Sequence, residues 1–546
     1  MFWICLTLAS LTTAVMAVTK EDISYQRELT GDYWLDGAHG ELQKALENQN
    51  RGVAKNIILF IGDGMGPPSV TAGRILAGQL QGKKGEEFSL TFEKFPQTGL
   101  SKTYAVDEQV TDSAAAATAF LCGVKTNRKI LGLNARAQDG NCSSTTGANV
   151  HSILRWATNA GKSTGIVTTT RITHATPAGA YAHSPDRDWE SDRLIPSSEK
   201  QCKDIAYQLI KENSDINVIL GGGRAYFYPE NYTDPDPDPK FNTSEVSRTD
   251  GLNLIQEWVA EKKEKGVFVY NRQGLDQVDV SSTDYLLGLF AQGHMSFDVE
   301  RNASREPALH QMVEKAVRIL QRNKNGFFLL VEGGRIDSAH HDTQPVKAIH
   351  DVVAMDKAVK MVLDLTDSSD TLTVVTADHS HVMSIAGYAT RGNPIFALSD
   401  LDGVINTKRT LDHLPFTTLV YANGPGYKVP RPNITEVETG NVNYVSQSAV
   451  PMKSETHGGE DVAIYAHGPQ SFLYAGVHEQ SYIPVAMAYA SCIGPYAKEE
   501  NKLCARPAQN IPNVENSSSR TSIPRQLYIL LTYLSLIYIT CHRLVL

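Results

Sequence analysis

Residues 326–331 read GFFLLV, and the polar stretch Glu332-Gly333-Gly334-Arg335-Ile336-Asp337 follows them directly. A short apolar run of this length that ends at glycines predicts a strand buried on both faces of a sheet. Similar runs occur at 56–61, 165–169, 217–220 and 371–376. Helical periodicity lies between these runs, as in the steps of three and four residues from Ile349 to Val362. The sequence therefore predicts an α/β fold with a doubly wound, mostly parallel central sheet flanked by helices.

Other segments refine this outline. Two later runs, 417–421 and 461–465, are expected to extend the same sheet. Residues from about 386 to 453 interrupt the alternation with many Gly and Pro, and we interpret them as an insertion. Alternating Asp-Pro at 231–240 predicts a surface loop. On the helix with the Ile349 period, the expected solvent-facing residues are Lys347, Asp351, Lys357 and Lys360.

Composition excludes several classes of protein. The chain has 546 residues, of which 41% are hydrophobic and 20% charged, which does not fit a coiled coil, a collagen, a disordered acidic tail or a multispanning membrane protein. The net charge is −9, from 51 basic and 60 acidic residues, and no Lys/Arg cluster stands out. Such a chain is a poor candidate for binding nucleic acid.

Both ends resemble targeting segments. Residues 1–17 are apolar and end in Val15-Met16-Ala17, which predicts a secretory signal peptide, with a buried first helix as the alternative. Near the other end, small residues from Asn516 are followed by a polar spacer (519–526) and a 13-residue apolar run (527–539), shorter than the roughly 20 residues of a spanning helix. This pattern predicts a glycosylphosphatidylinositol (GPI) anchor at Asn516 or Ser517, with 517–546 removed and 18–516 held at the outer cell surface. A short single-span anchor is the alternative.

Cysteine usage agrees with secretion. Cys5 and Cys541 lie in the two end segments, and the five others are Cys122, Cys142, Cys202, Cys492 and Cys504. In an oxidising compartment the simplest pairing is Cys142–Cys202 and Cys492–Cys504, with Cys122 free in a buried helix. The candidate N-glycosylation sites are Asn141, Asn231, Asn242, Asn302, Asn433 and Asn516.

Ionisable residues follow three of the predicted strands directly. They are Asp63 after 56–61, Glu332 and Asp337 after 326–331, and Asp378 and His379 after 371–376. Because the carboxyl ends of parallel strands meet at one edge, we expect these side chains to lie together. A single Asp after a strand is usually a helix cap. Four carboxylates at one edge, however, would repel each other unless cations offset them.

The kinds of donor present indicate which cations. Asp337 and His341 are four residues apart and would face the same way on a helix. His457 lies in a further exposed stretch, Glu455-Thr456-His457-Gly458-Gly459. Carboxylate and imidazole ligands suit Zn²⁺, whereas an all-oxygen set suits Mg²⁺.

Two segments indicate a phosphate ligand. Ser113 follows Asp112 and starts an alanine-rich helix; it is either a simple cap or a hydroxyl in the anion-favouring field of a helix N-terminus. Arg171 follows the run at 165–169, and its planar guanidinium matches two phosphate oxygens. Beside a metal cluster, these residues suggest phosphoryl transfer.

Six motifs between about Trp34 and Cys504 resemble those of alkaline phosphatases of the secreted, GPI-anchored animal type. They are IGDGMG (61–66), VTDSAAAATA (110–119), TTTRITHATPAGAYAH (168–183), FFLLVEGGRIDSAHHD (327–342), TADHSH (376–381) and ETHGGEDV (455–462). The resemblance implies a metal-dependent phosphomonoesterase of broad specificity, active at alkaline pH, with two Zn²⁺ and one Mg²⁺ per subunit.

The resemblance also implies a role for each site residue. Ser113 would be the nucleophile that forms a phosphoserine intermediate. Asp337, His341 and His457 would hold the first zinc; Asp63, Asp378, His379 and Ser113 the second; and Asp63, Thr176 and Glu332 the magnesium. Arg171, positioned by Asp112, would bind the phosphate oxygens. His174 would lie beside the magnesium ligands, and His381 would contact phosphate or the groups that surround the metals.

Assembly is implied in the same way. Family members are homodimers, residues 19–50 resemble an arm that wraps the partner, and 386–453 resemble a crown-like subdomain whose Tyr388 reaches the neighbouring site. Phe227 and Ala291 stand where a further calcium site would need carboxylates, so no fourth ion is expected.

Two other functions stay open from the sequence. A superfamily sulfatase or phosphodiesterase is one, although Asp112-Ser113-Ala114-Ala115-Ala116 lacks the C/S-x-P-x-R pattern of sulfatases. A GPI-anchored surface receptor or docking protein with little or no catalysis is the other, although every implied ligand position is filled.

Overall fold

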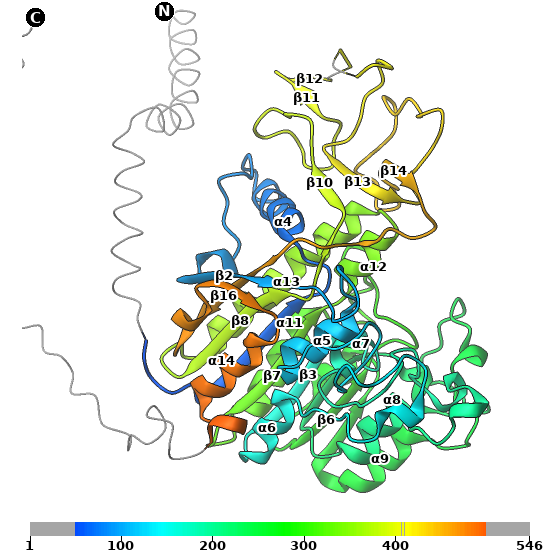
Figure 1. The fold of residues 1–546 in the computed structure, drawn as a ribbon, viewed down its shortest axis with the longest axis vertical. Coiled ribbons are helices and arrows are strands. Elements are labelled where there is room, and N and C mark those ends of the chain that lie inside the picture. The colour runs from blue at the N-terminus through cyan, green and yellow to red at the C-terminus, as the bar shows by residue number, and fades with distance from the viewer. Residues whose placement is uncertain (1–49, 406, 409, 498–546) are drawn as a thin grey trace, which may run out of the picture. The chain divides into compact units, whose positions relative to one another are not determined.

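The computed structural model describes residues 50–405, 407–408 and 410–497, and a ten-stranded sheet forms the centre of this part of the chain (Figure 1). The strand order is β17-β2-β16-β8-β1-β7-β3-β4-β6-β5. The strands are β1 (Asn56–Gly62), β2 (Gln97–Lys102), β3 (Ser163–Arg171), β4 (Val218–Gly222), β5 (Gly266–Val269), β6 (Tyr285–Leu289), β7 (Phe327–Gly333), β8 (Thr371–Ala377), β16 (Val462–His467) and β17 (Gly476–Glu479). Only β16 runs antiparallel to its neighbours, so the predicted α/β fold with a mostly parallel sheet is confirmed.

Three neighbouring strands of the sheet, β1, β7 and β8, end at the same level. Every residue of β1, β7 and β8 is buried, as their uninterrupted apolar runs predict. Gly62 at the end of β1 pairs with Gly333 of β7 and with Ala377 of β8. The residues that follow these three strands therefore leave the sheet at the same edge.

Helices cover both faces of the sheet. They are α4 (Pro67–Gln79), α5 (Ser113–Cys122), α6 (Ile153–Asn159), α7 (Ala175–Ala178), α8 (Ile205–Tyr207), α9 (Leu254–Lys262), α10 (Arg272–Gln277), α11 (Leu309–Leu320), α12 (Arg335–His341), α13 (Pro345–Leu365) and α14 (Tyr482–Ser491). One hydrophobic core holds buried residues of α5, α6 and α14, and a second core holds those of α4, α11 and α13. Two cores separated by one sheet are what a doubly wound arrangement requires.

One face of α13 differs from the prediction. Lys357 and Lys360 are exposed as expected, but Lys347 and Asp351 are buried. Lys347 lies 3.2 Å from a carboxylate oxygen of Glu300, and the Asp351 carboxylate accepts a hydrogen bond from a main-chain N–H of the same loop. That loop covers the start of the helix, and helical periodicity cannot reveal it.

The insertion forms small sheets of its own. Strands β10 (Met383–Ile385), β13 (Leu419–Gly424) and β14 (Ser448–Pro451) make one, and β11 (Asp400–Leu401) and β12 (Val404–Ile405) make another. The run at 417–421 therefore does not extend the central sheet, whereas 461–465 does, as part of β16. Apolar spacing predicts a strand but does not determine which sheet it joins.

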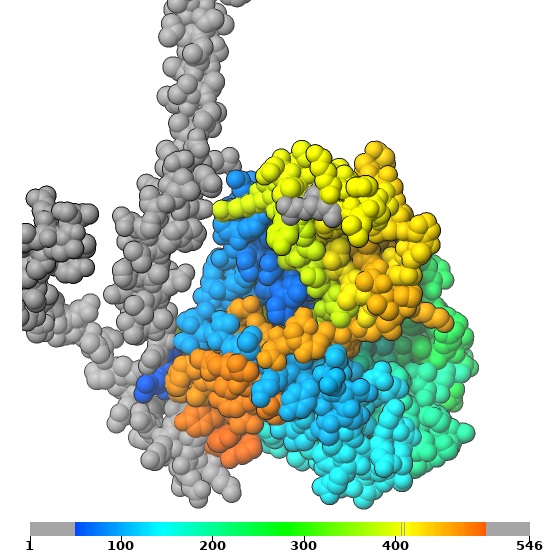
Figure 2. Space-filling view, turned by 45° about the horizontal axis from the view of Figure 1, so that its top comes forward, coloured from blue at the N-terminus to red at the C-terminus, as the bar shows by residue number. Residues whose placement is uncertain are grey.

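The end of α4 supports the insertion. The side-chain amide of Gln79 donates to the carbonyl of Asn393 and accepts from the N–H of Ile395, at 2.9 and 3.0 Å. Figure 2 shows the yellow surface of the insertion beside the blue surface that contains α4.

Several sequence predictions concern the chain ends. The signal peptide (1–17), nearly all of the arm (19–50), Cys504, Asn516, Ser517 and the GPI segment lie outside the described residues. Within the described ranges, Cys142 is bonded to Cys202, Cys492 is disulfide-bonded, and Cys122 is a buried free thiol in α5. No helix in these ranges is long and apolar enough to cross a membrane. The sequon residues Asn231, Asn242, Asn302 and Asn433 are exposed, and Asn141 is half-buried.

Candidate active site

The common edge of β1, β7 and β8 brings the predicted carboxylates together. Asp63, Glu332 and Asp378 come directly from these strands and are fully buried, and Asp337 sits on the first turn of α12. We call these four residues the carboxylate rim. The helix begins at Arg335, so Asp337 and His341 lie one turn apart on one face, as predicted.

A glycine lets the chain turn at this edge. Gly64 has a positive φ of 68°, and its N–H donates to the Asp378 carboxylate at 2.9 Å. A Cβ on Gly64 would lie 2.4 Å from the His381 ring. Only glycine fits both the backbone conformation and the close approach, which explains its place in IGDGMG.

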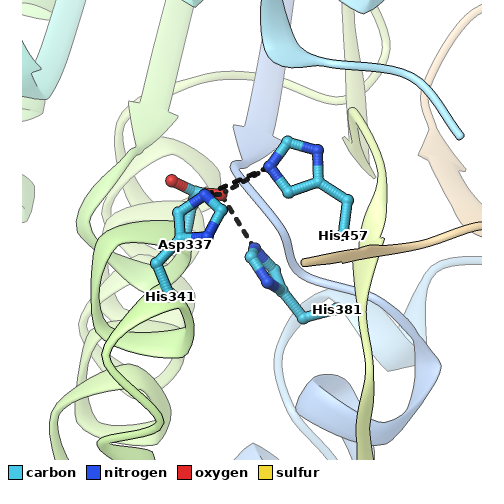
Figure 3. Close-up of side chains that lie close together, drawn as sticks. All are labelled: Asp337, His341, His381 and His457. Carbon is cyan, nitrogen blue, oxygen red and sulfur yellow. Dashed lines mark hydrogen bonds and ion pairs between the residues drawn. The ribbon is translucent and has the colours of Figure 1, made fainter. Parts of the chain in front are cut away.

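One group of potential ligands is centred on Asp337. Its carboxylate and the imidazoles of His341, His381 and His457 place four ligand atoms within 4.8 Å of one another (Figure 3). The Oδ1 atom of Asp337 lies 3.3, 2.8 and 3.4 Å from the Nε2 atoms of His341, His381 and His457. The three residues predicted to hold the first zinc are thus together, and His381 is close enough to be a fourth ligand or to orient Asp337.

A second group surrounds the predicted nucleophile. Nε2 of His379 lies 3.0 Å from Oδ2 of Asp378, 3.5 Å from Oδ1 of Asp63 and 3.3 Å from the Ser113 hydroxyl. The same hydroxyl is 3.5 Å from Asp63. All four residues are buried, and the His379 and His457 rings stack at 3.5 Å, so the first two groups adjoin.

A third group lies beside Glu332. Asp63, His174 and Glu332 have ligand atoms within 4.8 Å of one another, and the fully buried Thr176 is on α7, which begins directly after His174. Within the described part of the chain, Asp63 Oδ2, Thr176 Oγ1 and Glu332 Oε1 are buried without a hydrogen-bond partner. Buried polar atoms are seldom left in that state, so these oxygens fit a missing ligand.

The pKa values of the rim carboxylates also indicate a site for cations. Burial, followed by repulsion from Asp378, Asp337 and Glu332, raises the pKa of Asp63 well above its ordinary value. Burial also raises the pKa of Glu332 to about 7. Burial and mutual repulsion thus oppose ionisation of these carboxylates at neutral pH, and nearby positive charge would favour it. The donor sets suit zinc where imidazoles contribute and magnesium where oxygens dominate.

Asp112 has a different arginine partner from the predicted one. It caps α5 by accepting the N–H of Ala115 at 3.1 Å, and it accepts the N–H of Lys129 at the same distance. Its second oxygen accepts from Nη1 of Arg187 at 3.1 Å. The predicted pairing of Asp112 with Arg171 is therefore wrong.

Arg171 faces another acid. Its guanidinium makes three hydrogen bonds of 2.6–3.1 Å to the buried carboxylate of Glu190. Arg187 instead reaches towards the rim, where its Nη2 lies 3.0 Å from Nε2 of His174. No sequence signal marks Arg187, because it stands in a loop, 16 positions after Arg171, rather than at the end of a strand. Glu455 is a further residue without a predicted role, although it lies in the ETHGGEDV motif.

Known proteins with similar sequences indicate the family of this chain. A family model described as alkaline phosphatase matches residues 54–493. An alkaline phosphatase of Gadus morhua is 52% identical over 86% of this chain and 98% of its own length. The human alkaline phosphatase, tissue-nonspecific isozyme, is 49% identical over 89% of this chain and 93% of its own length.

Solved structures support the same fold. The Thermus thermophilus alkaline phosphatase aligns with a TM-score of 0.58 at 23% identity, over 81% of this chain and 93% of its own. The enzyme of the Antarctic bacterium TAB5 aligns with a TM-score of 0.55 at 23% identity, over 82% of this chain and all of its own. The family model and the close sequence relatives show that the chain belongs to the alkaline phosphatase family, and these structures share its fold.

Proposed function

We propose that the protein is a metal-dependent phosphomonoesterase that hydrolyses phosphate monoesters with broad specificity at alkaline pH. The observation that carries this proposal is the carboxylate rim: buried acidic oxygens without partners, next to imidazoles and a helix-start hydroxyl. Family membership supports the same activity.

The proposed metal content is two Zn²⁺ and one Mg²⁺ per subunit. Asp337, His341 and His457 would hold the first zinc, and Asp63, Asp378, His379 and Ser113 the second. Asp63, Thr176 and Glu332 would hold magnesium, with His174 beside them. When bound, these cations would lower the pKa of nearby hydroxyl groups and stabilise charge on the oxygens that enter and leave phosphorus.

The chain's own groups would carry the reaction in two displacements. The Ser113 oxygen attacks phosphorus, the bond to the substrate alkoxide breaks, and the alkoxide leaves as an alcohol after taking a proton. Water then attacks the phosphoserine, phosphate departs, and the Ser113 hydroxyl is restored. The position of Ser113 at the start of α5 supports this role, because main-chain N–H groups there favour an anion.

We propose Arg187, in place of Arg171, as the residue that binds the phosphate oxygens. Asp112 would orient it, through the ion pair at 3.1 Å. The Arg171 guanidinium is engaged at all three nitrogens, because Nε and Nη2 donate to Glu190 and Nη1 contacts the His294 ring. A guanidinium held by one carboxylate can still present two N–H groups to an anion.

Assembly and location are part of the proposal. A homodimer would cover exposed apolar side chains of the insertion, among them Tyr388, Val404, Ile405, Leu411 and Val429. A GPI lipid at Asn516 or Ser517 would hold the protein at the outer face of the plasma membrane, which the sequence of 516–539 supports.

An activity assay on purified protein without 517–546 tests the function. We expect hydrolysis of a simple aryl phosphate to be fastest above pH 8, to stop with a chelator and to recover with Zn²⁺ plus Mg²⁺. A preparation that hydrolyses aryl sulfates or phosphodiesters faster than the monoester would favour the superfamily alternatives. A metal-loaded protein with none of these activities would favour a receptor.

A further inference from the structure

Glu455 lies beside the Asp337 group and holds two of its imidazoles. Glu455 is 1% exposed, and its carboxylate accepts from Nδ1 of His381 at 2.5 Å and from the N–H of Val382 at 2.7 Å. Its main-chain carbonyl accepts from Nδ1 of His341 at 2.5 Å. These contacts lie behind the rings, on the side away from Asp337.

The contacts fix which nitrogen faces inward. A carbonyl or carboxylate oxygen only accepts, so Nδ1 of each ring carries the proton and Nε2 is directed at Asp337 (Figure 3). His457 follows the same pattern, because its Nδ1 donates to the carbonyl of Thr111 at 2.8 Å. Imidazoles that bind metals are commonly held in this way by an outer acceptor.

Glu455 also links the two short strands that carry His381 and His457. Strand β9 (Ser380–His381) pairs antiparallel with β15 (His457–Gly458), and His381 is opposite His457. Glu455 precedes β15, and Val382 follows β9. The bond between them therefore ties the two strands together where they present their imidazoles.

We propose that Glu455 is a positioning residue for the first zinc site, whose carboxylate fixes the His381 ring against Asp337. The inference rests on the proposed function only for the identity of the ion. Of the three acceptors behind the rings, the Glu455 carboxylate is a side chain and the other two are main-chain carbonyls, so mutation can remove it alone.

Glu455→Gln in the protein spanning 18–516 is the test. His381 and Val382 donate to different oxygens of Glu455, so glutamine, which has the same shape, would leave one of these donors facing its NH2 group. Metal is removed with a chelator and zinc is titrated back by calorimetry, with metal content measured by elemental analysis. We expect one tight site to weaken by about 10–100-fold and the other sites to keep their affinity.

Glu460→Gln is the matched control. Glu460 accepts from the Ser380 hydroxyl at 2.7 Å on the same pair of strands, and the change in charge is the same. No imidazole is recorded against it among the described residues, so this variant should bind zinc like the wild type. Equal weakening in the two variants would show a general electrostatic effect and would overturn the inference.

A double variant separates positioning from a structural role. If Glu455 acts through His381, adding Glu455→Gln to His381→Gln should weaken zinc binding less than threefold further. A full, additive loss, or wild-type affinity in Glu455→Gln alone, contradicts the inference. Should Glu455→Gln fail to fold, Glu455→Asp keeps both oxygens but shortens their reach, and wild-type affinity there would contradict it too. A wild-type protein that takes up no zinc would instead overturn the proposed function.

Discussion

Buried carboxylates have different partners in two regions of the molecule. In the arginine cluster, formed by Arg224 with Asp234 and Arg248 with Asp204, buried acids face guanidinium groups. Arg248 donates to both oxygens of Asp204 at 2.9 Å, and Nε of Arg224 donates to both oxygens of Asp234 at 3.0 Å. The carboxylate rim has imidazoles, other carboxylates and oxygens without a recorded partner.

The contrast indicates which of the two regions is suited to bind cations. Charges that only support the fold are neutralised by the chain itself, because an unpaired buried charge costs several kcal/mol. The carboxylate rim lacks such guanidinium partners, which fits the cations proposed for it. The two regions should therefore respond differently to mutation, to metal removal and to pH.

The largest effect is expected from the hydroxyl at the rim. Ser113→Ala should lower kcat by at least about 1000-fold, because no other group described here is placed to take the phosphoryl group. Bound zinc should stay close to the wild-type amount, as His379, Asp63 and Asp378 are unchanged. Steady-state kinetics with metal analysis measures both.

Ser152→Ala is the control for that change. Ser152 is another buried helix-start serine, which caps α6. Its loss should cost about 1 kcal/mol of stability and leave turnover unaltered. A Ser113→Ala enzyme with near wild-type kcat would show that Ser113 is not the nucleophile.

A smaller effect, on stability rather than turnover, is expected in the arginine cluster. Arg248→Ala leaves Asp204 buried without its guanidinium, so the free energy of unfolding should fall by about 3–5 kcal/mol. The exposed pair of Arg318 with Glu314 is the comparison, where Arg318→Ala should cost under about 1 kcal/mol. Denaturant unfolding of metal-loaded protein measures both, and loss of bound zinc in folded Arg248→Ala would contradict the division between the regions.

The two candidate phosphate ligands, Arg187 and Arg171, should also differ in whether their loss affects phosphate binding or stability. Arg187→Ala should raise the inhibition constant of inorganic phosphate about 30-fold, equivalent to about 2 kcal/mol for a charge-assisted contact. Arg171→Ala should change that constant less than threefold and lower the melting temperature instead, since it leaves Glu190 buried without its partner. The reverse ranking would restore Arg171 as the phosphate ligand.

The smallest effect concerns pH and the metal-free protein. The pKa of Glu332 is raised by burial from 4.5 to about 7, so the folded chain binds its proton more tightly than the unfolded chain. This group therefore lowers stability progressively as pH rises from about 4.5 to 7. In chelator-treated protein, Glu332→Gln should melt like the wild type near pH 4.5 and several degrees higher near pH 7.5. A difference in melting temperature that does not change with pH would contradict this origin.

The sequence predicts the rim well because each part of it has a local signal. Asp63, Glu332 and Asp378 each follow an apolar run, and the rule that parallel strands end at one edge brings them together. Arg187 has no such signal, since its position depends on how a long loop folds back towards Asp112. Lys347 has no such signal either, because helical spacing does not show that a separate loop covers it.

The insertion shows the same limit. The run at 417–421 has the apolar pattern of a central strand, and only the pairing of β13 with β10 and β14 assigns it to a separate sheet. Local patterns thus identify elements, while contacts between distant segments decide how they are used.

Metal content tests the central claim most directly. Elemental analysis of the active protein, with anomalous diffraction at the zinc absorption edge, should find two zinc ions and one magnesium ion per chain. One zinc ion should lie about 2.0–2.2 Å from donor atoms of Asp337, His341 and His457, and the other at the same distance from those of Asp63, Asp378 and His379. Full phosphatase activity in protein free of zinc, or zinc bound away from the rim, would contradict the account.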